Sequence, residues 1–141
     1  MKEYPVKITD RSFIIQVGEN ARENWELIDY ADKFDLWFHL DNVPSGHVVI
    51  KEILTKKIHV VIKNDIKDDI KNDIKDDIKN DIKNDFFGYP PELIHMACLY
   101  CKAQSKYKNN KTTVIYTTIA NVKKEKNIGS VSIKNSKYVI L

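Results

Sequence analysis

The sequence lacks two features that would place it in a membrane or in an oxidising compartment. No run of about eighteen apolar residues occurs, so no segment is long enough to cross a bilayer as a helix. The first residues, Met1 to Pro5, contain no apolar secretory signal. Its two cysteines give no disulfide framework and suit a reducing compartment. We therefore expect a cytoplasmic protein, with the nucleus as an alternative and no membrane partner.

Motifs for common enzyme chemistries are also lacking. The sequence contains no nucleophile elbow, P-loop, glycine-rich dinucleotide turn or HExxH zinc motif. Cys98 and Cys101 form a C-x-x-C, which leaves redox or zinc chemistry open, but the pair falls in the middle of a predicted helix. A thiol pKa is lowered at a helix N-terminus, so we interpret both residues as buried, unreactive thiols. We predict a non-catalytic protein without metal or cofactor.

Positive charge is concentrated in the C-terminal third. The whole chain carries a net charge of +3, whereas residues 102–141 contain nine lysines and one glutamate, a balance of +8. This distribution is typical of a protein that binds a polyanion, although an ordinary solvated surface would look the same. We predict phosphate contacts from two groups of lysines, one at the end of a helix and one in a loop: Lys102, Lys106 and Lys108, and Lys123, Lys124 and Lys126.

The alternation of apolar residues predicts a central β-hairpin from residues 35–40 and 46–50. Pairing Phe38 with Val48 puts Leu36, Phe38, Leu40, Val48 and Ile50 on one face, whereas a slip of one residue would break this face. The opposite face carries Asp35, Trp37, His39 and His47, and we expect it to be half-exposed, with Trp37 pointing into a surface groove.

Three roles remain open for this polar face. His39 and His47 could tie the hairpin to the helix that begins after Asn20. Together with Trp37 they could instead stack on unpaired nucleotides. A metal or acid–base site that includes Asp35 is the weakest interpretation, because a fourth ligand is lacking.

The remaining patterns predict an α+β domain over residues 1–141, with an antiparallel sheet and two principal helices. Residues 63–85 repeat Lys-(Asn/Asp)-Asp-Ile with a period of four, which suits neither regular element, so we interpret them as a long low-complexity insertion in a loop. The other expected elements are an opening hairpin from Val6 to Val17, a helix from about Ala21 to Ala31 with Asn20 as its N-cap, a helix from Pro91 to about Tyr107, a strand from Thr112 to Ala120, a basic loop from Asn121 to Asn127, and a closing hairpin of Val131–Ile133 with Tyr138–Leu141.

Several ordered segments resemble the NFACT-R domain family. They include residues 18–24, 35–39, 46–50, 105–106, 114–117, 122–124 and 129–131, so the resemblance covers nearly the whole chain outside the repeat. It implies a module that binds nucleic acid, chiefly RNA, with tRNA, rRNA and DNA as candidate ligands, and a link to ribosome quality control. We therefore predict a non-catalytic RNA-binding module. The alternative is an adaptor that docks on a ribosomal or quality-control protein.

Overall fold

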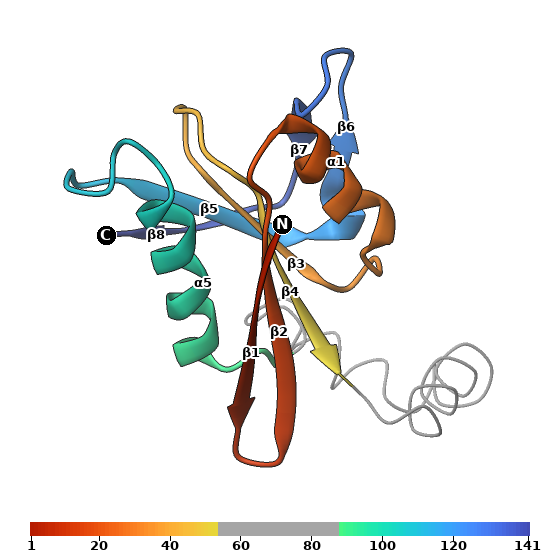
Figure 1. Ribbon diagram of the computed structural model, residues 1–141, viewed down its shortest axis with the longest axis vertical. Helices are drawn as coiled ribbons and strands as arrows, with labels where there is room; N and C mark the ends of the chain where they lie inside the picture. The colour runs from red at the N-terminus through yellow and green to blue at the C-terminus, as the bar shows by residue number, and fades with distance from the viewer. Residues whose placement is uncertain (54–87) are drawn as a thin grey trace.

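A six-stranded antiparallel sheet forms the centre of the computed structural model, which describes residues 1–53 and 88–141 (Figure 1). The strand order is β1-β2-β4-β3-β5-β8, and β6 and β7 form a separate two-stranded sheet. The elements are β1 (Lys2–Ile8), β2 (Arg11–Val17), α1 (Ala21–Tyr30), β3 (Leu36–Leu40), β4 (Val48–Ile53), α5 (Pro91–Ala103), β5 (Thr113–Thr118), a 3-10 turn (Ile119–Asn121), β6 (Val122–Lys124), β7 (Val131–Ile133) and β8 (Lys137–Ile140). The α+β class, the antiparallel sheet and the two principal helices are confirmed. The predicted insertion, residues 63–85, lies outside the described residues.

The predicted register of the central hairpin is confirmed. Phe38 pairs with Val48 and Leu36 with Ile50. These residues are fully buried in one cluster that also contains Leu40. Burial of one face fixes the register, because a slip of one residue would turn the whole apolar set to the opposite side.

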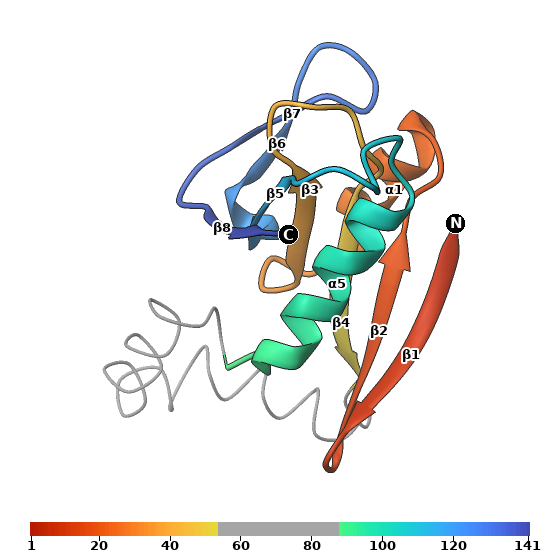
Figure 2. The ribbon, with the colours of Figure 1, turned by 90° about the vertical axis from the view of Figure 1, so that its left-hand side faces the viewer.

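The two faces of the sheet are covered by different elements (Figures 1 and 2). Helix α5 packs its buried side, which includes Leu93, Ala97 and Cys101, on the face that carries Phe38. Helix α1 and the β6–β7 hairpin cover the opposite face, where Trp37 contacts a second cluster. The core is therefore double, with one layer on each side of the sheet.

This second layer corrects our expectation for Trp37. The side chain does point away from the larger cluster, but it is only 1% exposed and packs with Leu27, Val49 and Ile119. We expected this face to be half-exposed because the residues that cover it are distant in sequence and no local pattern reveals them. Val131 and Ile133, about ninety positions along the chain, close over it.

The C-terminal third differs from expectation in three places. Helix α5 ends at Ala103, whereas we expected it to continue to about Tyr107. Residues 122–124 of the predicted basic loop form strand β6, which pairs with β7. The last strand, β8, pairs with β5 and not with β7, so the closing hairpin is wrong. The pairings of the short strands β6, β7 and β8 depend on packing with distant parts of the chain, which local alternation does not specify.

The opening hairpin and the first helix agree with the sequence analysis. Strands β1 and β2 pair from Lys2–Val17 to Ile8–Arg11. Helix α1 begins after Asn20, whose side chain accepts a hydrogen bond from the Glu23 amide at 2.9 Å. Glu23 in turn accepts from the Glu19 amide at 2.9 Å. These contacts satisfy two amides near the start of the helix and fix its N-terminus beside the central hairpin.

Candidate functional site

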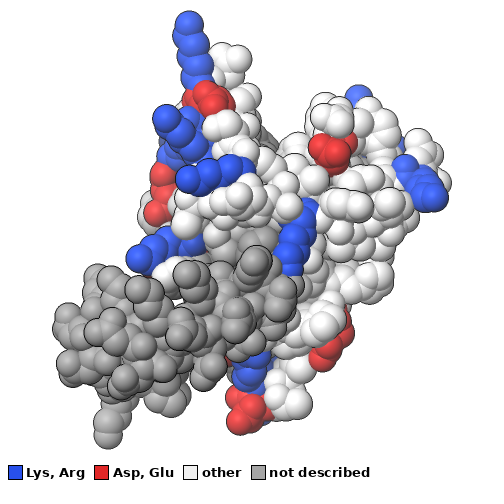
Figure 3. Space-filling model, turned by 180° about the vertical axis from the view of Figure 1, so that it is seen from behind, with Lys and Arg blue, Asp and Glu red and all other residues white. Residues whose placement is uncertain are grey.

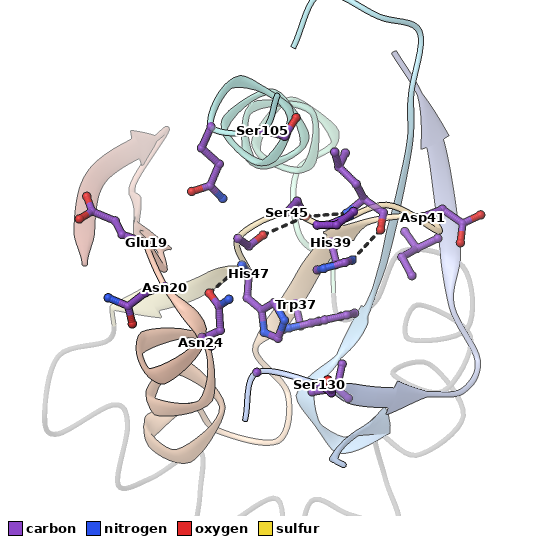
Figure 4. Close-up of a pocket in the computed structure, with 18 of the residues that line it drawn as sticks. Glu19, Asn20, Asn24, Trp37, His39, Asp41, Ser45, His47, Ser105 and Ser130 are labelled. Atoms are coloured by element: carbon purple, nitrogen blue, oxygen red, sulfur yellow. Dashed lines mark hydrogen bonds between the residues drawn. The ribbon is translucent and has the colours of Figure 1, made fainter. Parts of the chain in front are cut away.

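A cavity of about 760 Å³ opens where the N-terminus of α1, the 41–47 loop, the end of α5 and the 128–131 segment meet (Figure 4). Its lining includes Trp37 and His39 from β3 and His47 from the loop before β4. This volume falls within the range of small-ligand pockets. The predicted polar face of the hairpin therefore forms the floor of an open pocket, in which Trp37 and His47 are buried and His39 is partly exposed.

Two glycines allow the walls of this cavity to approach one another. A Cβ on Gly46 would lie 2.4 Å from the Gly18 carbonyl oxygen and 2.5 Å from the Gln104 side chain. Gly129 has a φ of +86°, and a Cβ there would lie 2.8 Å from the Cβ of Ala21. Any larger residue at either position would force the backbone apart.

The backbone around His47 ties the hairpin to helix α1. The His47 amide donates to Asn24 Oδ1 at 2.9 Å (Figure 4). The Gly18 amide donates to the His47 carbonyl at 2.9 Å. Asn24 is 7% exposed, so its carbonyl satisfies an amide that water cannot reach. The structural role that we considered for His47 thus exists, but the main chain performs it and leaves the imidazole ring to the cavity.

Three aromatic rings meet at the floor of the cavity. Trp37 and His39 lie nearly parallel, with ring centroids 5.7 Å apart, and His47 stands edge-on to both at 5.1 and 5.2 Å. Burial lowers the pKa of His39. Burial, with a smaller effect from His39, lowers the pKa of His47 to about 3. Both imidazoles are therefore neutral near pH 7, and each offers one N–H and one acceptor nitrogen.

The hydrogen bonds of these rings are incomplete. His39 Nδ1 lies 2.5 Å from the Leu40 carbonyl oxygen, which can only accept, so Nδ1 carries the proton and Nε2 is the acceptor. Trp37 Nε1 and His47 Nδ1 are buried and have no partner among the described residues. A buried polar atom without a partner costs roughly 1–3 kcal/mol, so two of them in one cavity wall call for an explanation.

The predicted lysines come from two parts of the chain, the end of α5 and the β6–β7 hairpin. Lys106 lines the cavity beside the end of α5, whereas Lys123 and Lys126 belong to the β6–β7 hairpin. Seen from behind, basic side chains project at the tip of that hairpin, near the middle of the face and at the opposite edge, with uncharged surface between them (Figure 3).

Two of the six lysines are engaged within the domain. Lys124 forms an ion pair with Asp29 and lies over the Trp25 ring, 5.1 Å from its centroid. Lys102 Nζ donates to the Leu141 carbonyl at 3.2 Å. Lys106, Lys108, Lys123 and Lys126 are exposed, and none of them forms an ion pair within residues 1–53 and 88–141.

The geometry supports neither a metal or acid–base site that includes Asp35 nor redox or zinc chemistry at Cys98 and Cys101. Asp35 is held by the Asp32 amide at 2.9 Å and Lys51 at 3.3 Å. In the part of the chain that the structure describes, no three His, Cys, Asp or Glu side chains are grouped as metal ligands would be. Cys98 and Cys101 are unpaired and buried, and burial raises the pKa of both thiols to about 12.

Several lining residues were not among our predicted site residues. Asn24, Gln104, Ser105 and Ser130 come from three segments that only the fold brings together. One signal did exist, because six of the segments that carry the family resemblance contribute to the cavity: residues 18–24, 35–39, 46–50, 105–106, 114–117 and 129–131. Positions far apart in sequence thus converge on one place.

Fold and cavity together define an α+β domain with a cavity that is lined by aromatic, apolar and polar side chains and a few charged ones. The profile of the NFACT protein RNA binding domain matches residues 3–135. The chain belongs to this family, NFACT-R, as the resemblance in the sequence predicted.

Individual relatives match over shorter stretches. Coiled-coil domain-containing protein 25 of Bos taurus is 31% identical over 71 residues, which cover 42% of this chain and 34% of that protein. The Rqc2 homolog RqcH of Streptococcus suis is 47% identical over 47 residues, 33% of this chain and 8% of that protein. The matched part of the chain therefore spans about a third of the length of coiled-coil domain-containing protein 25 and less than a tenth of the length of RqcH.

A solved structure shows the same fold. The C-terminal of the fibronectin/fibrinogen-binding protein from Streptococcus suis superposes with a TM-score of 0.65 at 23% identity, covering all of this chain and 45% of that one. Among the described residues, neither helix is long and apolar enough to cross a membrane.

Proposed function

We propose that this domain binds RNA without catalysing a reaction, and that phosphates lie against exposed lysines on both sides of the cavity. The observation that carries the proposal is the position of the cavity. Its wall includes Lys106 on one side and the base of the Lys123- and Lys126-bearing hairpin on the other. An RNA strand that crosses the cavity would meet both groups. Membership of the RNA-binding family supports the same function.

The electrostatic part of binding rests on fewer lysines than the sequence suggested. Lys102 and Lys124 already have partners in the domain, so the best candidates for phosphate contacts are Lys106, Lys108, Lys123 and Lys126. Each lysine that neutralises a phosphate on a single strand steepens the dependence of log K on log salt by about 0.7. The number of phosphate contacts can therefore be found by measuring this slope for lysine variants.

The test is a titration of labelled single-stranded, hairpin and tRNA-like RNAs, with duplex DNA as a comparison, at several salt concentrations. Changing Lys123 and Lys126 together to Gln should weaken binding to every RNA and flatten the salt slope by about 1.4. Lys124→Gln is the matched control in the same hairpin and should change the slope less, because Asp29 already pairs with this ammonium. An unchanged affinity and slope in the folded double variant would remove the hairpin from the interface. Absence of binding by the unmutated protein at low salt would refute the function.

A protein-docking adaptor is the second candidate, and one observation favours it. Strand β8 lies at the edge of the large sheet and exposes Tyr138 by 68% and Ile140 by 54%. Such an edge can pair with a strand of another protein. The similarity to RqcH makes a ribosome-associated, cytoplasmic partner the first to test. Retention on purified ribosomes at about 0.5 M salt, where exposed charges are largely screened, and its loss on Tyr138→Ser would favour this function over RNA binding.

A further inference from the structure

The starting observation is the pair of unpartnered polar atoms in the cavity wall. Trp37 is 1% exposed and His47 is 2% exposed, yet Trp37 Nε1 and His47 Nδ1 find no partner among the described residues. Other polar groups of the wall do have partners, since the His47 amide donates to Asn24 Oδ1 and the Leu40 amide to Ser45 Oγ. Two buried ring nitrogens without a partner among the described residues match a site that is completed by a ligand.

The chemistry of these atoms selects a planar heterocycle. Trp37 Nε1 can only donate, whereas His39 Nε2 can only accept once Nδ1 has donated to the Leu40 carbonyl. A nucleobase offers both acceptors and donors along one edge and an aromatic face on each side. His39 is the most exposed of the three rings, so its face is the first that an incoming base would meet. Apolar side chains such as Ile115 and Ile128 complete the lining.

The charges around the cavity determine which part of a nucleotide enters. The N-terminus of α1 would attract a phosphate, but Asn20 and Glu23 already accept its amides. Glu19 and Asp41 add negative charge to the lining, whereas Lys106 supplies a cation next to the end of α5. A phosphate is therefore repelled from the α1 side and attracted to Lys106. The neutral base is the part that fits inside.

We propose that the cavity receives one unstacked nucleobase of a bound RNA. The base lies against the His39 ring, the Trp37 indole N–H and the imidazole nitrogens of His39 and His47 pair with its edge, and its phosphate lies at Lys106. The inference rests on the RNA-binding function proposed above and adds to it a site for a single flipped-out base. The Trp37 and His47 nitrogens are shielded from water in the free protein, so the rim yields slightly when the base enters.

Two RNAs of equal charge test the inference. The first is a short hairpin with one bulged adenosine, and the second is the same hairpin with an abasic ribose at the bulge. Their phosphates are identical, so the electrostatic contribution cancels and only the base differs. Stacking of one base contributes about 1–3 kcal/mol, and the bulged hairpin should therefore bind about 5- to 150-fold more tightly. Hairpins with each of the other three bases at the bulge show whether the cavity is selective.

Nitrogen-15 NMR of the two indole N–H groups adds a readout at the proposed contact. Trp37 has an unpaired N–H, whereas Trp25 Nε1 already donates to the Ser130 carbonyl at 3.2 Å. The bulged hairpin should move the Trp37 signal downfield and leave the Trp25 signal nearer its original position, while the abasic hairpin should move neither. Trp25→Phe assigns the two signals. Trp37→Phe, which keeps a ring but removes the N–H, should reduce the preference for the base without changing affinity for the abasic hairpin.

The outcomes separate this inference from the proposed function. Equal affinities for the two hairpins, with a stationary Trp37 signal, would overturn the base site and leave RNA binding intact. Movement of the Trp37 signal by free AMP, with no preference between hairpins, would also overturn it, because the occupant would then be a free nucleotide. If no hairpin binds at low salt, RNA binding fails and the base site fails with it. If Trp37→Phe does not fold, the comparison of the bulged and abasic RNA hairpins with the unmutated protein still tests the inference.

Discussion

Replacing Trp37 by alanine should destabilise the domain strongly, because this side chain is the largest in the layer between the sheet and helix α1. It is 1% exposed and contacts Leu27, Val49 and Ile119. Truncation of a buried aromatic ring to alanine typically costs 3–5 kcal/mol, through lost burial and the cavity left behind. A domain of this size should then lose roughly 10 °C or more in melting temperature.

The matched control is the other tryptophan. Trp25 is only partly buried and contacts Ser130 and Lys124 at the surface. We expect Trp25→Ala to cost about 1–2 kcal/mol, since it loses one hydrogen bond and partial burial. Urea unfolding followed by circular dichroism measures both variants. If Trp37→Ala were no more destabilising than Trp25→Ala, the α1 layer would not cover this face, and the half-exposed tryptophan of the sequence analysis would be right.

Three further outcomes are expected. Burial lowers the pKa of His47 from 6.5 to about 3, so between these values the unfolded chain binds one proton more than the folded chain. The free energy of unfolding should therefore fall by about 1.6 kcal/mol from pH 6.5 to pH 5. A urea series in which His47→Asn shows the same pH dependence would contradict this. Asn24→Ala should cost roughly 1–3 kcal/mol because it leaves the buried His47 amide without an acceptor, whereas Asn24→Asp, which keeps an acceptor, should cost less in the same assay. Cys98 and Cys101 should react with a thiol reagent at pH 8 only as fast as the protein opens, since both thiols are buried with raised pKa values; rapid labelling of the native protein would show that α5 does not cover them.

The parts of the fold that the sequence predicted are those with a strong local signal. The alternation from Leu36 to Leu40 and the return from Val48 specified both the hairpin and its register, and the structure shows that pairing. Asn20 followed by Glu23 marked the start of α1, where both side chains accept backbone amides. In each case residues within a few positions of one another carry the energetic preference.

The cavity required information that no local pattern contains. Its floor could be recognised as a set of unusual polar residues on one hairpin face, including Trp37, His39 and His47. Its walls come from the end of α5 and from Gly129, which packs on Ala21 across more than a hundred positions of sequence. The sequence shows that position 129 is a glycine, but it does not show that Ala21 is the neighbour that leaves no room for a side chain there. For the same reason the face was expected to be half-exposed, whereas Trp37 and His47 are buried on it.

The lysines show how secondary structure decides the use of charge. Residues 121–127 were interpreted as a loop, in which Lys123, Lys124 and Lys126 would all have faced solvent. Because residues 122–124 form a strand, neighbouring side chains point to opposite faces. Lys124 turns toward α1 and pairs with Asp29, whereas Lys123 stays exposed. A net charge of +8 in this third of the chain therefore overstates the number of ammonium groups available to a ligand. We expect the salt slope to report two contacts from this hairpin, Lys123 and Lys126, because Lys124 is already paired.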